Sequence, residues 1–109
     1  MTDKIVVLST CDSEDEAVQV ARGLVEKRLA ACVNIIAGAR SIYRWKDSIE
    51  DSPEWLLVIK SHRGLFPALQ EEIRKLHTYE VPEVIALQVV AGSERYLAWL
   101  DRELAPDPD

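Results

Sequence analysis

The sequence predicts a ferredoxin-like α+β sandwich, in which two helices cover one face of a four-stranded antiparallel sheet and a third helix follows at the C-terminus. Three observations lead to this class. The patterns of the chain give the order β-α-β-β-α-β followed by a helix, right-handed crossovers connect such units, and 109 residues are enough for one core. We therefore expect a single domain over residues 1–109.

The first two elements are a strand and an amphipathic helix. Residues 4–11, KIVVLSTC, are rich in β-branched side chains and lead into turn-forming residues, which is typical of a strand. The stretch 12–30 repeats its apolar residues at helical spacing. Ser13 followed by Glu16 has the form of a capping box, so the helix should begin there.

A hairpin should come next. Residues 31–45 are predicted to form a long strand, bent at Gly38, and residues 54–61 form its partner. The polar stretch 46–54 supplies the turn. Pro53 falls where a strand can begin without losing a hydrogen bond of the ladder.

The remaining elements complete the sandwich. A second helix is expected over residues 64–76, with its apolar side chains on one stripe, and a fourth strand over residues 82–91. Residues 93–104 form a short helix capped by Ser93. The tail 105–109 is expected to be frayed.

Composition and charge exclude several classes. The net charge of −6 and the scattered basic residues argue against nucleic-acid binding. No apolar run reaches the ~20 residues of a membrane span and no signal peptide is visible, so we expect a cytoplasmic protein with no membrane partner. The two cysteines lack zinc-like spacing and should be free thiols. No local catalytic motif is present, which predicts a protein that is not an enzyme.

Both faces of the predicted sheet are apolar. The strand 4–11 places Ile5 and Val7 on one face and Val6 and Leu8 on the other, and the strands 54–61 and 82–91 behave alike. Two helices cover only one face, and soluble monomers rarely expose a large apolar patch. The protein should therefore be a homo-oligomer whose sheets face inward.

The segment HTYEVPE, residues 77–83, is the first candidate site. His77 can act as a metal ligand, or His77 and Tyr79 can simply close the preceding helix, and we favour helix closure on the donor count. Cys11 is the second candidate, because a thiol just before a helix N-terminus can be a soft ligand. The fourth strand runs antiparallel beside the first, so a Cys11/His77 site across this edge is geometrically possible.

Lys60 is the third candidate. It ends an otherwise apolar strand, where it can extend into solvent or meet Glu83 or Tyr79 in a polar pocket walled by Trp45. Such a pocket would bind a small anion.

The segments RLAACVNIIAGARSIYRW, LLVIKS and HTYEVPEVIAL resemble the CutA family, the divalent-cation tolerance proteins. The resemblance extends from Val6 to Trp99. It implies a ferredoxin-like homotrimer with sheets packed between subunits and a role in tolerance of metals such as copper. It also implies a cleft between subunits. The cleft residues carried over from the family pattern are Cys32, Tyr43, Trp45, Lys60, His77, Tyr79, Pro82 and Glu83.

The resemblance does not transfer a complete copper site. The copper site proposed for some bacterial members uses a strand cysteine and two adjacent histidines. Here Ser9 stands at the cysteine position, Leu76 stands at the first histidine position, and His77 is kept. Cys11 shares strand parity with Ser9 and can take its place.

We therefore expect a non-enzymatic homotrimer that responds to divalent metal ions such as copper. No cofactor is obligatory, and any metal would bind weakly through His77 and Cys11 at the cleft. The alternative is a trimeric signalling or interaction protein whose cleft holds an anion or a peptide.

Overall fold

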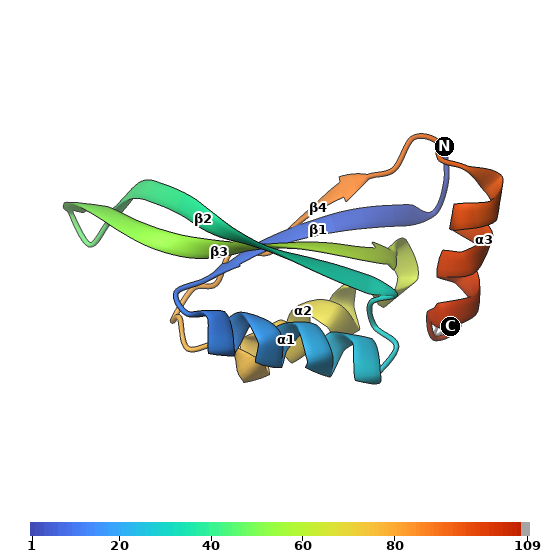
Figure 1. The fold of residues 1–109 in the computed structure, drawn as a ribbon, viewed down its shortest axis with the longest axis horizontal. Coiled ribbons are helices and arrows are strands. Elements are labelled where there is room, and N and C mark those ends of the chain that lie inside the picture. The colour runs from blue at the N-terminus through green and yellow to red at the C-terminus, as the bar shows by residue number, and fades with distance from the viewer. Residues whose placement is uncertain (108–109) are drawn as a thin grey trace.

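The computed structural model describes residues 1–107 and has the predicted order of elements, in two layers (Figure 1). The strands β1 (Lys4–Cys11), β2 (Cys32–Trp45), β3 (Ser48–His62) and β4 (Ile85–Gln88) form one antiparallel sheet in the order β2-β3-β1-β4. The helices α1 (Glu14–Glu26) and α2 (Phe66–Leu76) cover the same face, α2 preceded by the 3₁₀ turn η1 (Arg63–Leu65). The ferredoxin-like sandwich is confirmed.

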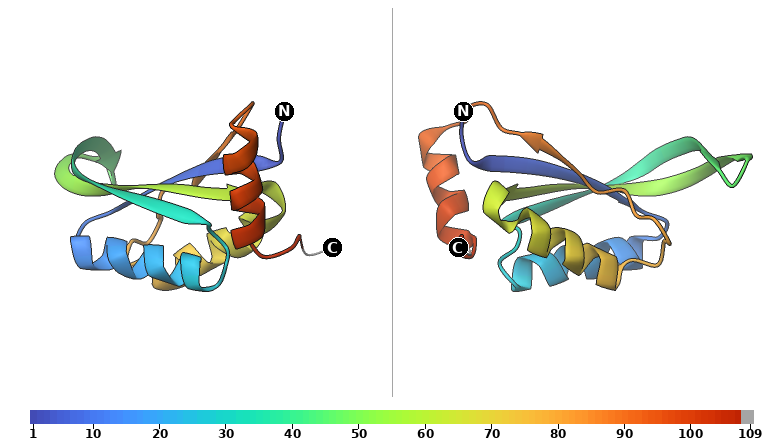
Figure 2. Two further views of the ribbon diagram at one scale, coloured as in Figure 1. Left: turned by 45° about the vertical axis from the view of Figure 1, so that its right-hand side comes forward. Right: turned by 180° about the vertical axis from the view of Figure 1, so that it is seen from behind.

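The helix α3 (Glu94–Glu103) packs against the end of the sandwich, away from the hairpin (Figure 2). Its Leu100, with Leu104 and Leu65, forms a small apolar cluster separate from the main core. Ala105, the first residue of the segment expected to fray, is held by hydrogen bonds. The Ala105 N–H donates to the Arg28 carbonyl at 2.9 Å, and the Ala105 carbonyl lies 3.1 Å from His62 Nε2. Residues 108–109 lie outside the described residues.

The main core lies between the helices and the sheet. β1 and β3 are neighbours, and their partners Val7 and Ile59 both point toward the helices and are fully buried. Leu24 of α1 and Leu69 and Ile73 of α2 complete this core and are also fully buried. Burial of this kind contributes about 1.5–3 kcal/mol per large aliphatic side chain. Among the helices of residues 1–107, none has the length and apolar character needed to cross a membrane.

The two ends of α1 are fixed differently. Ser13 Oγ accepts a hydrogen bond from the Glu16 N–H at 3.2 Å, as the capping box predicts. The helix ends at Glu26, earlier than expected, and Arg28 follows with a positive φ of 58°. The Leu29 N–H returns to the Leu24 carbonyl at 2.9 Å. A left-handed residue usually taken by glycine thus closes this helix.

The strands β3 and β4 differ most from the prediction. β3 begins at Ser48, so the expected loop 46–54 is only a two-residue turn. The hairpin extends beyond the helices (Figure 1). Strands outside the helical layer do not need apolar alternation, so this polar stretch forms strands without the sequence pattern that predicts them. β4 covers only Ile85–Gln88 instead of 82–91, because Pro82 has no N–H and pairing with β1 spans Ile5–Leu8.

A β-bulge in β2 controls the hairpin's side chains. Ile36 pairs with Leu56 and Ala39 with Glu54, so β2 has one extra residue, and Gly38 has a φ of 89°. The bulge confirms the predicted bend at Gly38. It also reverses the parity of β2. Even-numbered residues face away from the helices before the bulge and odd-numbered ones, including Tyr43, after it.

The bulge and the turn allow a matched stability test. Gly38→Ala has space for its Cβ but puts a side chain at a positive φ, so we expect a loss of about 1 kcal/mol in the free energy of unfolding. Asp47→Gly relieves a positive φ in the hairpin turn, so we expect a stabilisation of a few tenths of a kcal/mol up to about 1 kcal/mol. Denaturant melts at one protein concentration measure both. A change of the same sign in both variants would contradict this account.

Candidate functional site

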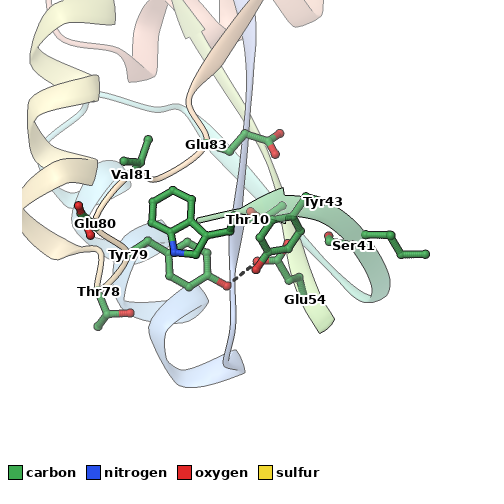
Figure 3. A pocket seen from close by; sticks show the side chains of 11 residues that line it. Thr10, Ser41, Tyr43, Glu54, Thr78, Tyr79, Glu80, Val81 and Glu83 are labelled. Carbon is green, nitrogen blue, oxygen red and sulfur yellow. Dashed lines mark hydrogen bonds between the residues drawn. The ribbon is translucent and has the colours of Figure 1, made fainter. Parts of the chain in front are cut away.

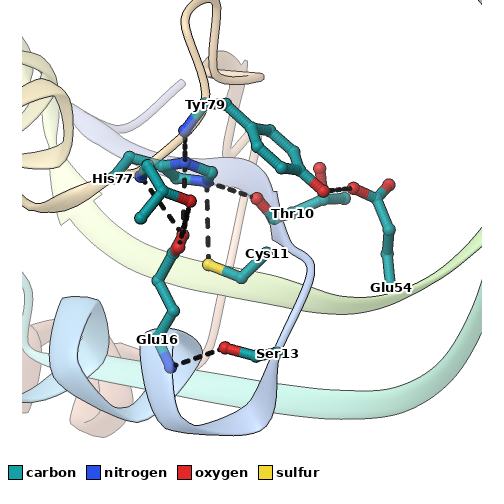
Figure 4. A network of polar contacts seen from close by, with 8 residues as sticks. Thr10, Cys11, Ser13, Glu16, Glu54, His77 and Tyr79 are labelled. Atoms are coloured by element: carbon teal, nitrogen blue, oxygen red, sulfur yellow. Dashed lines mark hydrogen bonds and ion pairs between the residues drawn. The ribbon is translucent and has the colours of Figure 1, made fainter.

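Three chain segments meet at one end of the sandwich (Figure 4). Cys11 ends β1, Glu16 lies in the first turn of α1, and His77 follows the last residue of α2. All three side chains are buried, and their candidate ligand atoms lie within 4.8 Å of one another. The predicted proximity of Cys11 and His77 is thus present within one chain, with Sγ and Nε2 3.7 Å apart.

His77 is held through both ring nitrogens. Nε2 lies 2.6 Å from the Thr10 carbonyl, which can only accept, so Nε2 carries a proton. Nδ1 accepts a hydrogen bond from the Tyr79 N–H at 3.0 Å, which is closer than the Glu16 carboxylate at 3.4 Å. These contacts assign the neutral Nε2–H tautomer. The predicted closure of α2 is also present, because the His77 N–H donates to the Ile73 carbonyl.

Glu16 was not predicted as a site residue. Its backbone N–H is capped by Ser13, but its carboxylate turns away from that cap and accepts hydrogen bonds from Thr78. The Thr78 hydroxyl lies 2.8 Å from Oε2 and the Thr78 N–H 3.3 Å from Oε1. Glu16 therefore joins the start of α1 to the loop after α2. The capping-box form of the sequence pointed to a different partner.

The Cys11 thiol is protonated at neutral pH. Burial, together with the negative charges of Glu16, Asp12 and Glu54, raises the pKa of Cys11 to about 12. The side chain is 0% exposed. A nearby helix N-terminus can lower the pKa of a thiol, but for Cys11 burial and the acidic neighbours outweigh that effect.

The three donors fit a borderline or soft divalent cation by type. Thiolate, imidazole and carboxylate are ligands of zinc and, for the first two, of copper. The protonation states of Cys11 and His77 in this arrangement do not suit metal binding, because a metal needs a thiolate and a free imidazole lone pair. The Cys11 proton and one hydrogen bond of His77 would have to be given up on binding.

A pocket of about 680 Å³ lies beside this cluster, between the β2–β3 hairpin and the loop before β4 (Figure 3). Four residues of the predicted cleft line it: Tyr43, Trp45, Tyr79 and Glu83. Cys32 and Lys60 do not. They are cross-strand partners elsewhere in the sheet, where the Lys60 ammonium contacts the Asn34 side chain.

Glu54 was missed by the sequence analysis and is the most buried acid of the pocket, with 4% of its surface exposed. Tyr79 donates its hydroxyl hydrogen bond to Glu54 Oε2 at 2.5 Å. Burial, then this bond and the charge of Glu54, raise the pKa of Tyr79 well above its usual value. Only the sheet register places Glu54 here, so no local sequence signal could have identified it.

Tyr79 connects the pocket to the buried cluster. Its hydroxyl reaches Glu54, its backbone N–H reaches His77, and its ring lies 4.6 Å from the His77 ring. Thr10 also contributes to both sites, since it lines the pocket and its carbonyl contacts His77. Tyr79 and Thr10 are therefore shared by the two sites.

The fold and the site together define a class, namely small ferredoxin-like sandwich proteins with a buried Cys–Glu–His cluster behind an open aromatic pocket. The family profile described as CutA1 divalent ion tolerance protein matches residues 5–103. The chain belongs to this family.

Relatives from distant organisms support this family assignment. The divalent-cation tolerance protein CutA of Thermus thermophilus is 48% identical over 95 residues, which cover 87% of this chain and 92% of that protein. Mouse protein CutA is 53% identical over 91 residues, covering 84% of this chain but 51% of the mouse protein. This chain therefore spans about half the length of its mammalian relatives.

Solved structures give the same result. The Thermus thermophilus Cut A1 structure superposes with a TM-score of 0.91 at 45% identity, covering 94% of this chain and 99% of that one. CutA1 of Oryza sativa superposes with a TM-score of 0.91 at 38% identity, covering 94% of each chain.

The burial of Cys11 predicts its reactivity. In a Cys32→Ser background, the remaining thiol should resist alkylation in native protein at pH 8 and react fully after denaturation, because a raised pKa keeps the thiol neutral. Mass spectrometry after a timed exposure to iodoacetamide measures the modified fraction. Native-state modification as fast as in denatured protein would contradict the buried position.

Proposed function

We propose that this protein is a non-enzymatic, cytoplasmic homotrimer that responds to divalent metal ions by binding them weakly at Cys11, Glu16 and His77. The observation that carries the proposal is the convergence of three ligand types within 4.8 Å in a member of the divalent ion tolerance family. The names of its bacterial relatives, divalent-cation tolerance proteins, support the same role.

The proposed metal site uses atoms that are already close. Cys11 Sγ, a His77 ring nitrogen and a Glu16 oxygen would hold the ion, and copper or zinc suits such a donor set. Weak binding follows because the thiol has to lose its proton and His77 a hydrogen bond. This combination favours a response at elevated metal concentration over permanent occupancy.

Calorimetric titration tests the metal site. Zinc, which has no redox chemistry, should bind wild type and bind Cys11→Ser and His77→Gln at least about tenfold more weakly. Because binding releases the Cys11 thiol proton, the apparent affinity for zinc should rise with pH, by up to about tenfold per pH unit between pH 6.5 and 8.5. Cys32→Ser is the matched control and should bind like wild type. Equal heats for wild type and His77→Gln, with both folded by circular dichroism, would overturn the His77 assignment.

The proposed trimer buries the outer face of the sheet, the face opposite to the helices. Side chains on all four strands make this face apolar: Val6, Leu8, Ile36, Leu56, Val58, Ile85 and Leu87. Ile85 and Leu87 are 50% and 51% exposed in the single chain. An apolar surface that continues across a sheet favours self-association. The number three rests on the likeness to the family.

Sedimentation equilibrium tests the assembly. The wild type should have three times the chain mass of 12.3 kDa, and Leu87→Glu should shift the protein toward monomer, because it places a charge in the buried interface. Val18→Glu is the control, since Val18 is 39% exposed on α1 in the other layer. A monomeric wild type, or a Leu87→Glu variant that stays fully trimeric, would contradict the proposed interface.

A further inference from the structure

Glu54 is a buried acid with no cationic partner among residues 1–107. It is 4% exposed, its hydrogen-bond partner is the Tyr79 hydroxyl, and none of the Lys or Arg side chains in this range forms an ion pair with it. A buried carboxylate is stable when it is paired with positive charge. Tyr79 occupies Oε2, which leaves Oε1 available to a donor from the pocket.

The pocket around Glu54 is acidic and aromatic. Glu80 and Glu83 add carboxylates, and the Lys46 ammonium lies 3.6 Å from Glu80 on the exposed rim. Three aromatic side chains form much of the wall: Tyr43, Trp45 and Tyr79. Figure 3 shows the Tyr79 hydroxyl directed at the Glu54 carboxylate. Aromatic faces attract cations, and a buried carboxylate adds a localised charge.

The size of the pocket selects the kind of cation. About 680 Å³ is in the range of small-molecule sites and is far larger than a bare metal ion needs. A hydrated metal ion would also leave the aromatic walls without contacts. Since the acids outnumber the basic groups, the pocket as described disfavours the anion of the alternative function, and Lys60 lies outside it.

We propose that this pocket binds a small organic cation, an amine with an apolar or aromatic body. The ammonium donates to Glu54 Oε1, and the body packs on Trp45 and Tyr43. Tyr79 is a positioning residue, because its hydroxyl fixes the carboxylate that receives the ligand. The proposal uses neither the buried Cys–Glu–His cluster nor a metal, and so it is independent of the proposed metal site. Tyr43 and Glu54 lie on the outer side of the sheet, so the proposal requires that the proposed trimer leave this pocket open.

Three ligands of one shape test the proposal. Phenethylamine, 2-phenylethanol and 3-phenylpropanoate share a phenyl ring and differ in carrying a positive, neutral or negative end. Calorimetry and shifts of backbone amide signals in NMR should show millimolar or tighter binding of the amine, with the other two at least about tenfold weaker. The amine affinity should fall as salt rises.

Single-residue variants locate the charge. Glu54→Gln keeps an acceptor for the Tyr79 hydroxyl and should lower the amine affinity about tenfold, while Trp45→Leu lowers it severalfold by removing a cation–π surface. Glu50→Gln is the matched control, an exposed acid of the same strand outside the pocket lining, and should bind like wild type. Thermal melts confirm that each variant is folded.

Three results would overturn the proposal. The first is equal binding of phenethylamine and 2-phenylethanol, because the pocket would then not recognise charge. The second is amine binding that Glu54→Gln leaves unchanged. The third is amine binding seen only at dilutions that dissociate the oligomer. In that case a basic side chain of a second copy of this chain would fill the pocket in the intact oligomer.

Discussion

The constraint on which this molecule depends is that a sheet with two apolar faces has helices on only one of them. Val7 and Ile59 face α1 and α2 and are fully buried, whereas Leu87 on the opposite face is half exposed. The covered face holds the fold of the single chain together. The uncovered face is the surface that the proposed trimer would bury, because soluble monomers rarely expose a large apolar patch.

The functional groups lie where that covering layer stops. At this end of the sandwich β1, α1 and α2 all begin or finish, so polar side chains replace the apolar core. His77 and Glu16 form hydrogen bonds with backbone and side-chain groups that would otherwise be unpaired at the ends of β1 and α2. The same contacts make the cluster a tight structural joint and a poor resident metal site. Metal binding as proposed would have to compete with these internal hydrogen bonds and would therefore be weak.

The sequence specified the fold well because the fold rests on local patterns. Helical periodicity, together with β-branched composition and turn residues, identified the four strands and three α-helices described here, and Gly38 correctly marked the bend in β2. The outer part of the hairpin was missed because its strands leave the helical layer, where apolar alternation is no longer required. Glu54 could not be found for a different reason. Its burial results from sheet register and from Tyr79, which comes 25 residues later in the chain. His77 and Cys11 were recognisable as ligand types, but their protonation depends on neighbours from separate segments.

The bulge at Gly38 has a consequence for how this family member tolerates changes in length. Beyond the bulge, Tyr43 and Trp45 of β2 line the pocket, so the loss or gain of one residue between the bulge and Tyr43 would turn both side chains to the other face of the sheet. In this part of the hairpin, residues can be added or removed without that change only in steps of two, and in both strands together. Length can change freely only between Trp45 and the turn. A binding surface grafted onto the hairpin should follow the same rule.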